Sequence, residues 1–376
     1  MTLLADVVDV LDGLWPAATA EPSDAVGPVC GDPHSPVRRV LFAVDPVDVV
    51  VDEALEWGAQ LVVTHHPLYL SGTTSVYGGS PKGGVVQRLV AGGSALFVAH
   101  TNADVAVDGV SAALADAIGL VDATPLRPSP PRVLLDRWVV YVPGDDADAV
   151  LDAMVAAGAG QVADYERCAF SVEGTATFLP RDRAEAGARA DVAERRLEVT
   201  APRALRAAVA AAVVASHPYE APVADVLETV PLPDGTGLGR VGQLPRALPL
   251  AEFAARVAAQ LPATAGGVRV AGDPQRLVHR VAVCGGAGDS LLSQAAAAGV
   301  DAYVTGDLRH HRASESLGAG LPALVDPGHW ASEWPWLPRA AAALAAALGP
   351  ATVETRVSAR VTDPWTLHVP TREESR

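Results

Sequence analysis

Histidines follow three separate apolar runs of the sequence. His65 and His66 come directly after LVVT, His100 ends ALFVAH, and His329 follows ALVDPG. An apolar run that stops at polar residues is typical of a buried strand, and parallel strands present ligand-binding residues beyond their carboxyl ends. The sequence therefore predicts that imidazoles from several strands meet at one edge of a sheet.

Two carboxylates stand four residues after histidines. Asp104 follows His100 in HTNAD, and Glu333 follows His329 in HWASE. Side chains at this spacing share one face of a helix, so a helix that begins at His329 would turn an imidazole and a carboxylate toward one ion. This combination of residue types indicates a metal site, as two histidines at the same spacing do in other motifs.

Adjacent histidines in an extended segment project in different directions, so His65 and His66 suit two neighbouring ions better than one. A carboxylate can bridge two ions roughly 3.5–4 Å apart, which is the geometry of two-metal hydrolytic sites. We therefore expect two divalent ions per chain: one on His65 and Asp104, the other on His66 and His329, with Glu333 as the bridge. Their nitrogen and oxygen donors suit Zn, Fe, Mn or Ni. The plainer alternative is a set of solvated polar residues at strand ends.

Other polar residues near these ligands are candidates for proton transfer. His100 and His311 are the expected catalytic residues, and His310, Asn102 and Asp307 belong to the same neighbourhood. All five could instead orient the ligands, contact a phosphate group or be polar loop residues. The sequence leaves these alternatives open.

Composition excludes several other functions. Hydrophobic residues make up 49% and charged residues 19% of the 376 residues, which indicates a globular protein long enough for two domains. The formal charge of −16, with no basic cluster, disfavours nucleic-acid binding. Lys82 is the only lysine and Gly83 follows it, so no P-loop is present, and the three cysteines show no CxxC spacing. The acidic N-terminus is unlike a signal peptide and the apolar runs are shorter than the roughly 18 residues of a membrane span, so we expect a cytoplasmic protein.

Strands and helices follow one order at the two ends of the chain and another order between them. Residues 39–64 and 280–306 show the strand-helix-strand pattern of an α/β domain. The proline-rich stretch 122–132 is typical of a linker, and the residues after it follow the order strand, helix, two strands, helix, strand of a ferredoxin-like fold. We expect a discontinuous α/β domain with an inserted ferredoxin-like α+β domain, with limits at 1–127, 132–235 and 240–376.

Three further motifs have plain structural interpretations. CGGAGDS at 284–290 lacks the third glycine of a dinucleotide-binding loop, since Leu291 takes its place, so a tight turn is expected. HPYE at 217–220 is either a second metal site or, as we favour, a turn fixed by Pro218. The tryptophans of EWPWLP are expected to pack against the core or another subunit.

Four blocks of the sequence also resemble a known family. LVVTHHPL, HTNADVAVDGV, YVTGDLRHH and DPGHWASEW are similar to signature blocks of the GTP cyclohydrolase I type 2 homologs, the Nif-three-like family. The resemblance places metal ligands at His65, His66, Asp104, His329 and Glu333. It also implies a homohexamer of two stacked trimers with metal sites that face a central cavity. The middle of the chain resembles the insert of longer bacterial members, which is similar to CutA-like and nitrogen-regulator-like ferredoxin folds.

These observations lead to two functional hypotheses. In the first, two divalent ions activate water and polarise the scissile bond of a nucleotide or another phosphorylated small molecule. The family label suggests hydrolytic opening of the purine ring of GTP. In the second, the protein is a non-catalytic metal-binding or regulatory protein, with the insert as a sensor of a small molecule or a gate of the cavity.

Overall fold

The chain forms two compact units, which we call the first and the second unit. The first comprises Met1–Ser129 and Asp234–Arg376, and the second comprises Pro130–Pro233. The second unit thus interrupts the first in sequence, while the exact domain limits given above remain a prediction. The computed structural model describes residues 2–130, 133–179, 189–318, 322–349 and 351–370.

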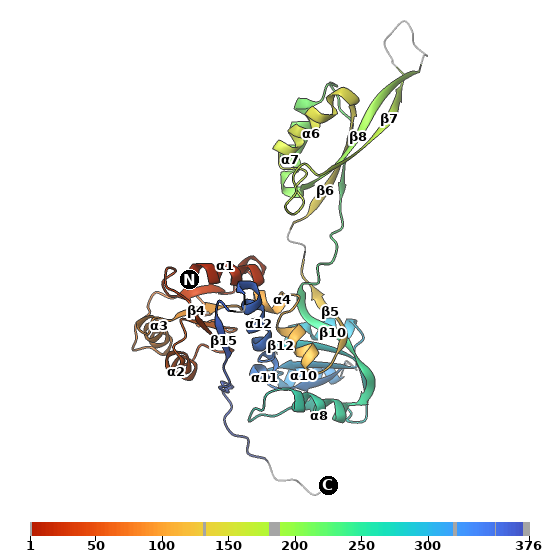
Figure 1. The fold of residues 1–376 in the computed structure, drawn as a ribbon. Coiled ribbons are helices and arrows are strands. Elements are labelled where there is room, and N and C mark those ends of the chain that lie inside the picture. Colours follow the sequence, from red (N-terminus) through yellow and green to blue (C-terminus); the bar gives the residue numbers. More distant parts are fainter. Residues whose placement is uncertain (1, 131–132, 180–188, 319–321, 350, 371–376) are drawn as a thin grey trace. The chain divides into compact units, whose positions relative to one another are not determined.

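One sheet of the first unit has helices on both faces. Its elements are β1 (Gly27–Cys30), β2 (Arg39–Ala43), β3 (Leu61–Thr64), β4 (Ala95–Val98), β15 (Glu354–Val357), α1 (Leu4–Leu14), α2 (Asp48–Trp57), α3 (Pro81–Ala91) and α12 (Trp336–Leu348). The strand order is β1-β4-β3-β2-β15, parallel except for the edge strand β1. Figure 1 labels β4 and β15 of this sheet and the helices α1, α2, α3 and α12 around it. Val40 and Phe42 pack with α1 and α12, whereas Leu41 and Ala43 pack with α2 and α3. Both faces are therefore buried, which explains the continuous apolar runs in the sequence.

A second sheet completes the first unit. Its strands are β5 (Val121–Pro128), β10 (Gly237–Pro249), β11 (Arg269–Ala271), β12 (Leu277–Ala287), β13 (Ala302–Gly306) and β14 (Ala323–Asp326). The order is β11-β14-β13-β12-β10-β5, and the three central strands β12, β13 and β14 run parallel. The accompanying helices are α4 (Thr101–Val105), α5 (Val110–Ala117), α8 (Leu250–Gln260), α9 (Leu292–Ala297), α10 (His310–Gly318) and α11 (His329–Glu333).

The linker prediction for residues 122–132 was wrong over most of its length. Residues 121–128 form β5, which pairs antiparallel with β10 at the edge of the second sheet. Prolines are compatible with an edge strand, because only one side of such a strand needs to donate hydrogen bonds. Because β5 contains Pro125 and Pro128 and lacks the apolar alternation of its neighbours, the sequence did not indicate a strand here.

The second unit is a single antiparallel sheet with two helices. It contains β6 (Leu135–Pro143), α6 (Ala147–Ala156), β7 (Ala169–Phe178), β8 (Ala190–Pro202), α7 (Arg206–Ser216) and β9 (Ala224–Glu228) in the strand order β7-β8-β6-β9. Trp138, Val140 and Val142 of β6 pack with both helices in one core. The order of elements agrees with the sequence expectation, and the ferredoxin-like assignment remains a proposal.

The aromatic motif near the C-terminus packs as expected. Trp336 is fully buried, and its ring meets that of Trp15 at 5.1 Å in an edge-to-face arrangement. This contact joins α12 to the chain that follows α1. Across the described residues, no helix combines the length and apolar character needed to cross a membrane.

Candidate metal centre

The carboxyl ends of strands from both sheets of the first unit supply the candidate site. His65 and His66 follow β3, and His100 lies just after β4 and precedes α4. His329 and Glu333 begin and end the short helix α11, which follows β14. The prediction of one sheet edge was incomplete, because β3 and β4 belong to one sheet and β14 to the other, so the carboxyl ends of parallel strands from two sheets bring these residues together.

Glu333 is at the middle of this cluster and only 4% of it is exposed. Its Oε1 lies 3.4 Å from Nε2 of His65 and 3.0 Å from Nε2 of His329. Its Oε2 lies 3.0 Å from Nε2 of His66, and the Nε2 atoms of His66 and His329 are 3.1 Å apart. Asp104 is at the margin, with Oδ1 3.9 Å from Nε2 of His65. The helical spacing of His329 and Glu333 thus has the consequence that the sequence predicts.

Each imidazole of the cluster donates a hydrogen bond from Nδ1 to an oxygen. The acceptors are the Ala99 carbonyl for His65 at 2.9 Å, Asp45 for His66 at 2.6 Å, Asp24 for His100 at 2.9 Å and Asp307 for His329 at 2.8 Å. An imidazole that donates from Nδ1 carries its lone pair on Nε2 when it is neutral, which is the tautomer that binds a metal. In all four imidazoles, Nε2 is therefore the nitrogen that could bind a metal ion.

His100 is held more firmly than the sequence suggested. Asp24, whose side chain is 6% exposed, also accepts hydrogen bonds from the backbone and hydroxyl groups of Thr101. Asn102 accepts from the backbone N–H of His100 at 2.8 Å and donates to the Trp15 carbonyl. One ring nitrogen of His100 lies within 4.8 Å of ring nitrogens of His65 and His66. Sequence reasoning missed Asp24 because nothing in its local pattern points to a residue 76 positions away.

Glycine makes room for the carboxylate. Gly286, with φ +64°, lies in the CGGAGDS motif near the end of β12, and a Cβ there would lie 2.3 Å from Oε1 of Glu333 and 3.1 Å from Nε2 of His329. Any side chain would displace the cluster, and the left-handed backbone also favours glycine. Residues 284–287 of the glycine-rich motif are the end of β12, and a 3-10 helix, Asp289–Leu291, begins after Gly288. The expected tight change from strand to helix is thus confined to Gly288, and Gly286 within the strand shapes the site.

Burial and charge act against each other in the cluster. Burial would raise the pKa of Glu333, but the charges of His66, His65 and His329 outweigh burial and hold it well below its usual value. Burial would lower the pKa values of His66 and His329, yet mainly the Glu333 charge raises them to about 11 and about 9. Burial raises the pKa of Asp104 to about 6 despite the opposing charge of His65. Without an added cation, protonated imidazoles therefore balance the negative charge of Glu333.

Two buried atoms in the cluster lack a hydrogen-bond partner. These are Nε2 of His65 and Oε2 of Glu333, which has His66 nearby but not in hydrogen-bond geometry. Buried polar atoms in native proteins are nearly always satisfied, and an unsatisfied one calls for an explanation. A divalent cation would satisfy both atoms at once, so the donor set fits a metal.

Not every predicted site residue joins the cluster. His310 and His311 are exposed at the start of α10, and their described contact is with one another. His217 of the HPYE motif accepts a hydrogen bond from the Tyr219 backbone N–H at Nδ1 and donates from Nε2 to the Tyr141 carbonyl, which supports the structural interpretation. Cys284 lies in β12, near Asp104 and Glu333. Burial raises the pKa of its thiol to about 12, so the thiol stays protonated at neutral pH.

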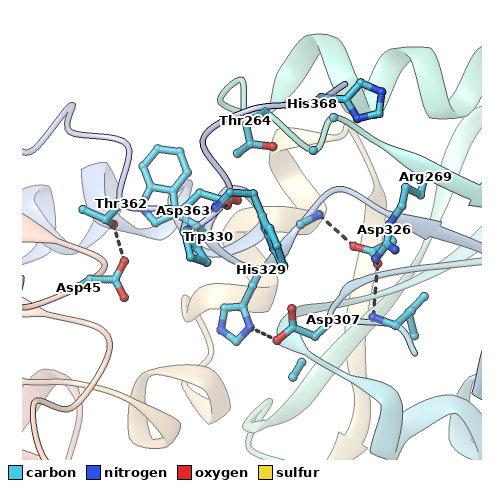
Figure 2. Close-up of a pocket in the computed structure, with 18 of the residues that line it drawn as sticks. Asp45, Thr264, Arg269, Asp307, Asp326, His329, Trp330, Thr362, Asp363 and His368 are labelled. Atoms are coloured by element: carbon cyan, nitrogen blue, oxygen red, sulfur yellow. Dashed lines mark hydrogen bonds and ion pairs between the residues drawn. The ribbon is translucent and has the colours of Figure 1, made fainter. Parts of the chain in front are cut away.

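A cavity of about 940 Å³ opens beside His66 and His329. Figure 2 shows His329 below the cavity with its hydrogen bond to Asp307, and Thr362 of the C-terminal segment against Asp45. The lining includes Asp289, which begins the 3-10 helix after β12, Asp307 directly after β13, and Asp326, the last residue of β14. A small molecule in this cavity would reach His66 and His329, which line it.

Comparisons with known proteins agree with this architecture. The family model of DUF34/NIF3 (NGG1p interacting factor 3) matches residues 2–364. The chain belongs to the DUF34/NIF3 family. A Mycobacterium tuberculosis member named "GTP cyclohydrolase 1 type 2 homolog" is 52% identical over 369 residues, which are 97% of each chain. The Streptomyces coelicolor protein of the same name is 40% identical over 98% of this chain and 95% of its own.

Solved structures of DUF34/NIF3 relatives have the same overall architecture. A Bacillus cereus protein described as related to NIF3 matches with a TM-score of 0.72 and 34% identity over 98% of this chain and 99% of its own. Staphylococcus aureus protein SA1388 matches with a TM-score of 0.80 and 28% identity over the same shares of the two chains. The resemblance seen in the four sequence blocks is thereby confirmed.

Proposed function

We propose that this DUF34/NIF3 protein holds two divalent metal ions and hydrolyses a nucleotide or another phosphorylated small molecule. The ligands are His65, His66, Asp104, His329 and Glu333, with Glu333 shared by both ions. The observation that carries this proposal is the pair of unsatisfied buried atoms, Nε2 of His65 and Oε2 of Glu333, within a cluster of preset imidazoles. Zn, Fe, Mn and Ni all suit these donors.

The residues of the chain have separate tasks in this proposal. Bound divalent ions would supply Lewis acidity and activate water. Asp45 and Asp307 orient the imidazoles of His66 and His329, because each accepts the Nδ1 proton. His100, held by Asp24, is the residue proposed to transfer a proton. His311 stays a predicted catalytic residue that no described contact supports.

Substitution of His66 tests the hydrolase directly. His66→Ala removes a proposed ligand that faces the cavity, so hydrolysis of GTP and of other nucleotides should fall to the background rate while circular dichroism stays unchanged. His310→Ala, an exposed change on α10, serves as the control and should keep full activity. Hydrolysis at the wild-type rate in His66→Ala would contradict the proposal. The alternative would then be that the protein is a non-catalytic metal-binding or regulatory protein.

Assembly and the role of the second unit are further parts of the proposal. The family resemblance supports a homohexamer of two trimers, and the strand order β7-β8-β6-β9 supports a ferredoxin-like insert. Light scattering of the full chain tests the assembly, and a stable monomer would contradict it.

A further inference from the structure

One wall of the cavity comes from a segment outside both sheets. This C-terminal segment, residues 358–370, follows β15 and has no helix or strand. Thr362, Asp363, Trp365 and His368 from it line the cavity together with His66 and His329. Figure 2 shows the labelled members of this segment, Thr362, Asp363 and His368, arranged along one side of the cavity.

The C-terminal segment contacts residues next to His66 and His329, the two proposed ligands that line the cavity. The Thr362 hydroxyl donates a hydrogen bond to Asp45, the same carboxylate that accepts from His66. Asp363 is only 9% exposed, and its Oδ2 would lie 3.6 Å from a Cβ on Gly328, the residue before His329. The Trp365 backbone N–H donates to Oδ1 of Asp363 at 2.8 Å. These contacts fix the backbone of Trp365 beside the open side of the metal centre.

The two arginines that line the cavity are each paired with one of its aspartates. Arg269 pairs with Asp326, and Arg309 pairs with Asp289 at 2.9 Å. Neither arginine is thus a free anchor for a phosphate group. Trp365, by contrast, is 72% exposed and offers a flat apolar surface to whatever enters. Indole faces stack on planar rings of any base, largely independent of its hydrogen-bonding groups.

We propose that Trp365 is an aromatic wall of the substrate cavity and that the substrate carries a planar heteroaromatic ring, as a nucleoside does. The proposal rests on the hydrolase function proposed above and narrows its substrate class. A sugar phosphate without a base would lack the stacking contact and would meet only arginines that aspartates already neutralise. Recognition therefore depends on the ring more than on the phosphate.

Calorimetric titration of the metal-loaded full chain tests this wall. The probes are guanosine, guanosine 5′-monophosphate and ribose 5-phosphate, and the first two should bind at least about tenfold more tightly than the third. Trp365→Ala should weaken guanosine binding about tenfold, while Trp365→Phe should keep most of it because phenylalanine also stacks. Val369→Ala is the matched control, since Val369 is 73% exposed on the same segment but does not line the cavity.

Three results would overturn the aromatic wall. They are unchanged guanosine binding in Trp365→Ala, equal binding of ribose 5-phosphate and guanosine, and a changed molecular mass of Trp365→Ala in light scattering. The last would mean that the indole packs against another copy of the chain. Failure of the hydrolase itself is distinguishable, because guanosine binding would then still depend on Trp365 while no nucleotide is turned over.

Discussion

Each unit of the molecule contains a buried carboxylate surrounded by cationic groups, and the two clusters differ in how completely they are satisfied. In the second unit, Asp136 is fully buried and accepts hydrogen bonds from Arg203 at 3.1 Å and from Arg206 at 2.7 and 2.9 Å. In the first unit, Glu333 is buried among three imidazoles and keeps an oxygen without a hydrogen-bond partner.

This difference separates a structural ion pair from a binding site. Guanidinium groups fit a carboxylate through paired hydrogen bonds and never lose their charge, so the Asp136 cluster is complete without a ligand. Imidazoles can lose a proton and offer a lone pair to a cation. The Glu333 cluster is therefore the one in which a metal can replace protons.

Removal of metal should produce the largest difference between the two units. An ion present at about 1,000 times its dissociation constant stabilises the folded state by about 4 kcal/mol, and chelation removes that stabilisation. Hydrogen exchange should therefore accelerate in β3 and α11 after treatment with EDTA, but not in β6 and β8. Mass-spectrometric exchange measures both regions in one sample, and equal acceleration in the two units would contradict the assignment.

Acid should empty the metal centre while it leaves the Asp136 cluster intact. In the metal-free protein the pKa of His329 is raised to about 9 and that of His66 to about 11, so each ligand must release a proton when an ion binds. Metal affinity should rise about tenfold per pH unit for each released proton between pH 6 and pH 9. Titrations with Zn²⁺ in buffers of different ionisation enthalpy count these protons, and a flat pH profile would be the contrary result.

The Asp136 cluster of the second unit also loses stability as the pH falls, but only at a much lower pH. The hydrogen bonds from Arg206 lower the pKa of Asp136, so its contribution to stability is present above the unfolded pKa of about 3.9 and is lost only as the pH falls through the lowered value. A sample at pH 5 should thus have lost metal but kept the structure of the second unit.

Asp45→Asn should have a moderate effect. The amide loses the charge that holds Nδ1 of His66, and such changes in residues that orient metal ligands weaken binding by about 10- to 100-fold. Asp48→Asn on α2 is the matched control, because Asp48 is 70% exposed and pairs with Arg88. Competition with a chromophoric zinc chelator gives both affinities, which should differ between the two variants.

Asp136→Asn should leave the metal centre unchanged. It should instead lower the midpoint of thermal unfolding of the second unit by about 5 °C or more, because both arginines lose their buried charged partner and keep only the exposed Glu228. Metal content measured on the same sample should equal that of the wild type. A loss of metal in this variant would show that the two clusters are not independent.

The sequence contained most of the information about which residues cluster and less about their surroundings. His329 and Glu333 were found because helical spacing is local, and the strand ends at His65 and His100 were found because apolar runs stop there. Asp24 and Asp45 were missed because their contacts with His100 and His66 depend on how distant strands are placed side by side.

For the fold too, local patterns were predicted from the sequence, whereas contacts between distant segments were not. Strands with continuous apolar runs, such as β3 and β13, were located correctly because burial on both faces leaves a clear pattern. β5 was taken for a linker because it is an edge strand with prolines and exposed residues. The division of the first unit into two sheets could not be predicted either, since strand partners in different segments leave no periodic signal.

The central claim is that Glu333 joins two metal ions, and metal content per chain tests it most directly. Elemental analysis should be made on protein purified without chelator or nickel resin, for the wild type and for Glu333→Ala. The account predicts close to two ions per chain in the wild type and almost none in Glu333→Ala. No bound metal in the wild type after incubation with Zn, Fe or Mn, or the same content in both proteins, would contradict it.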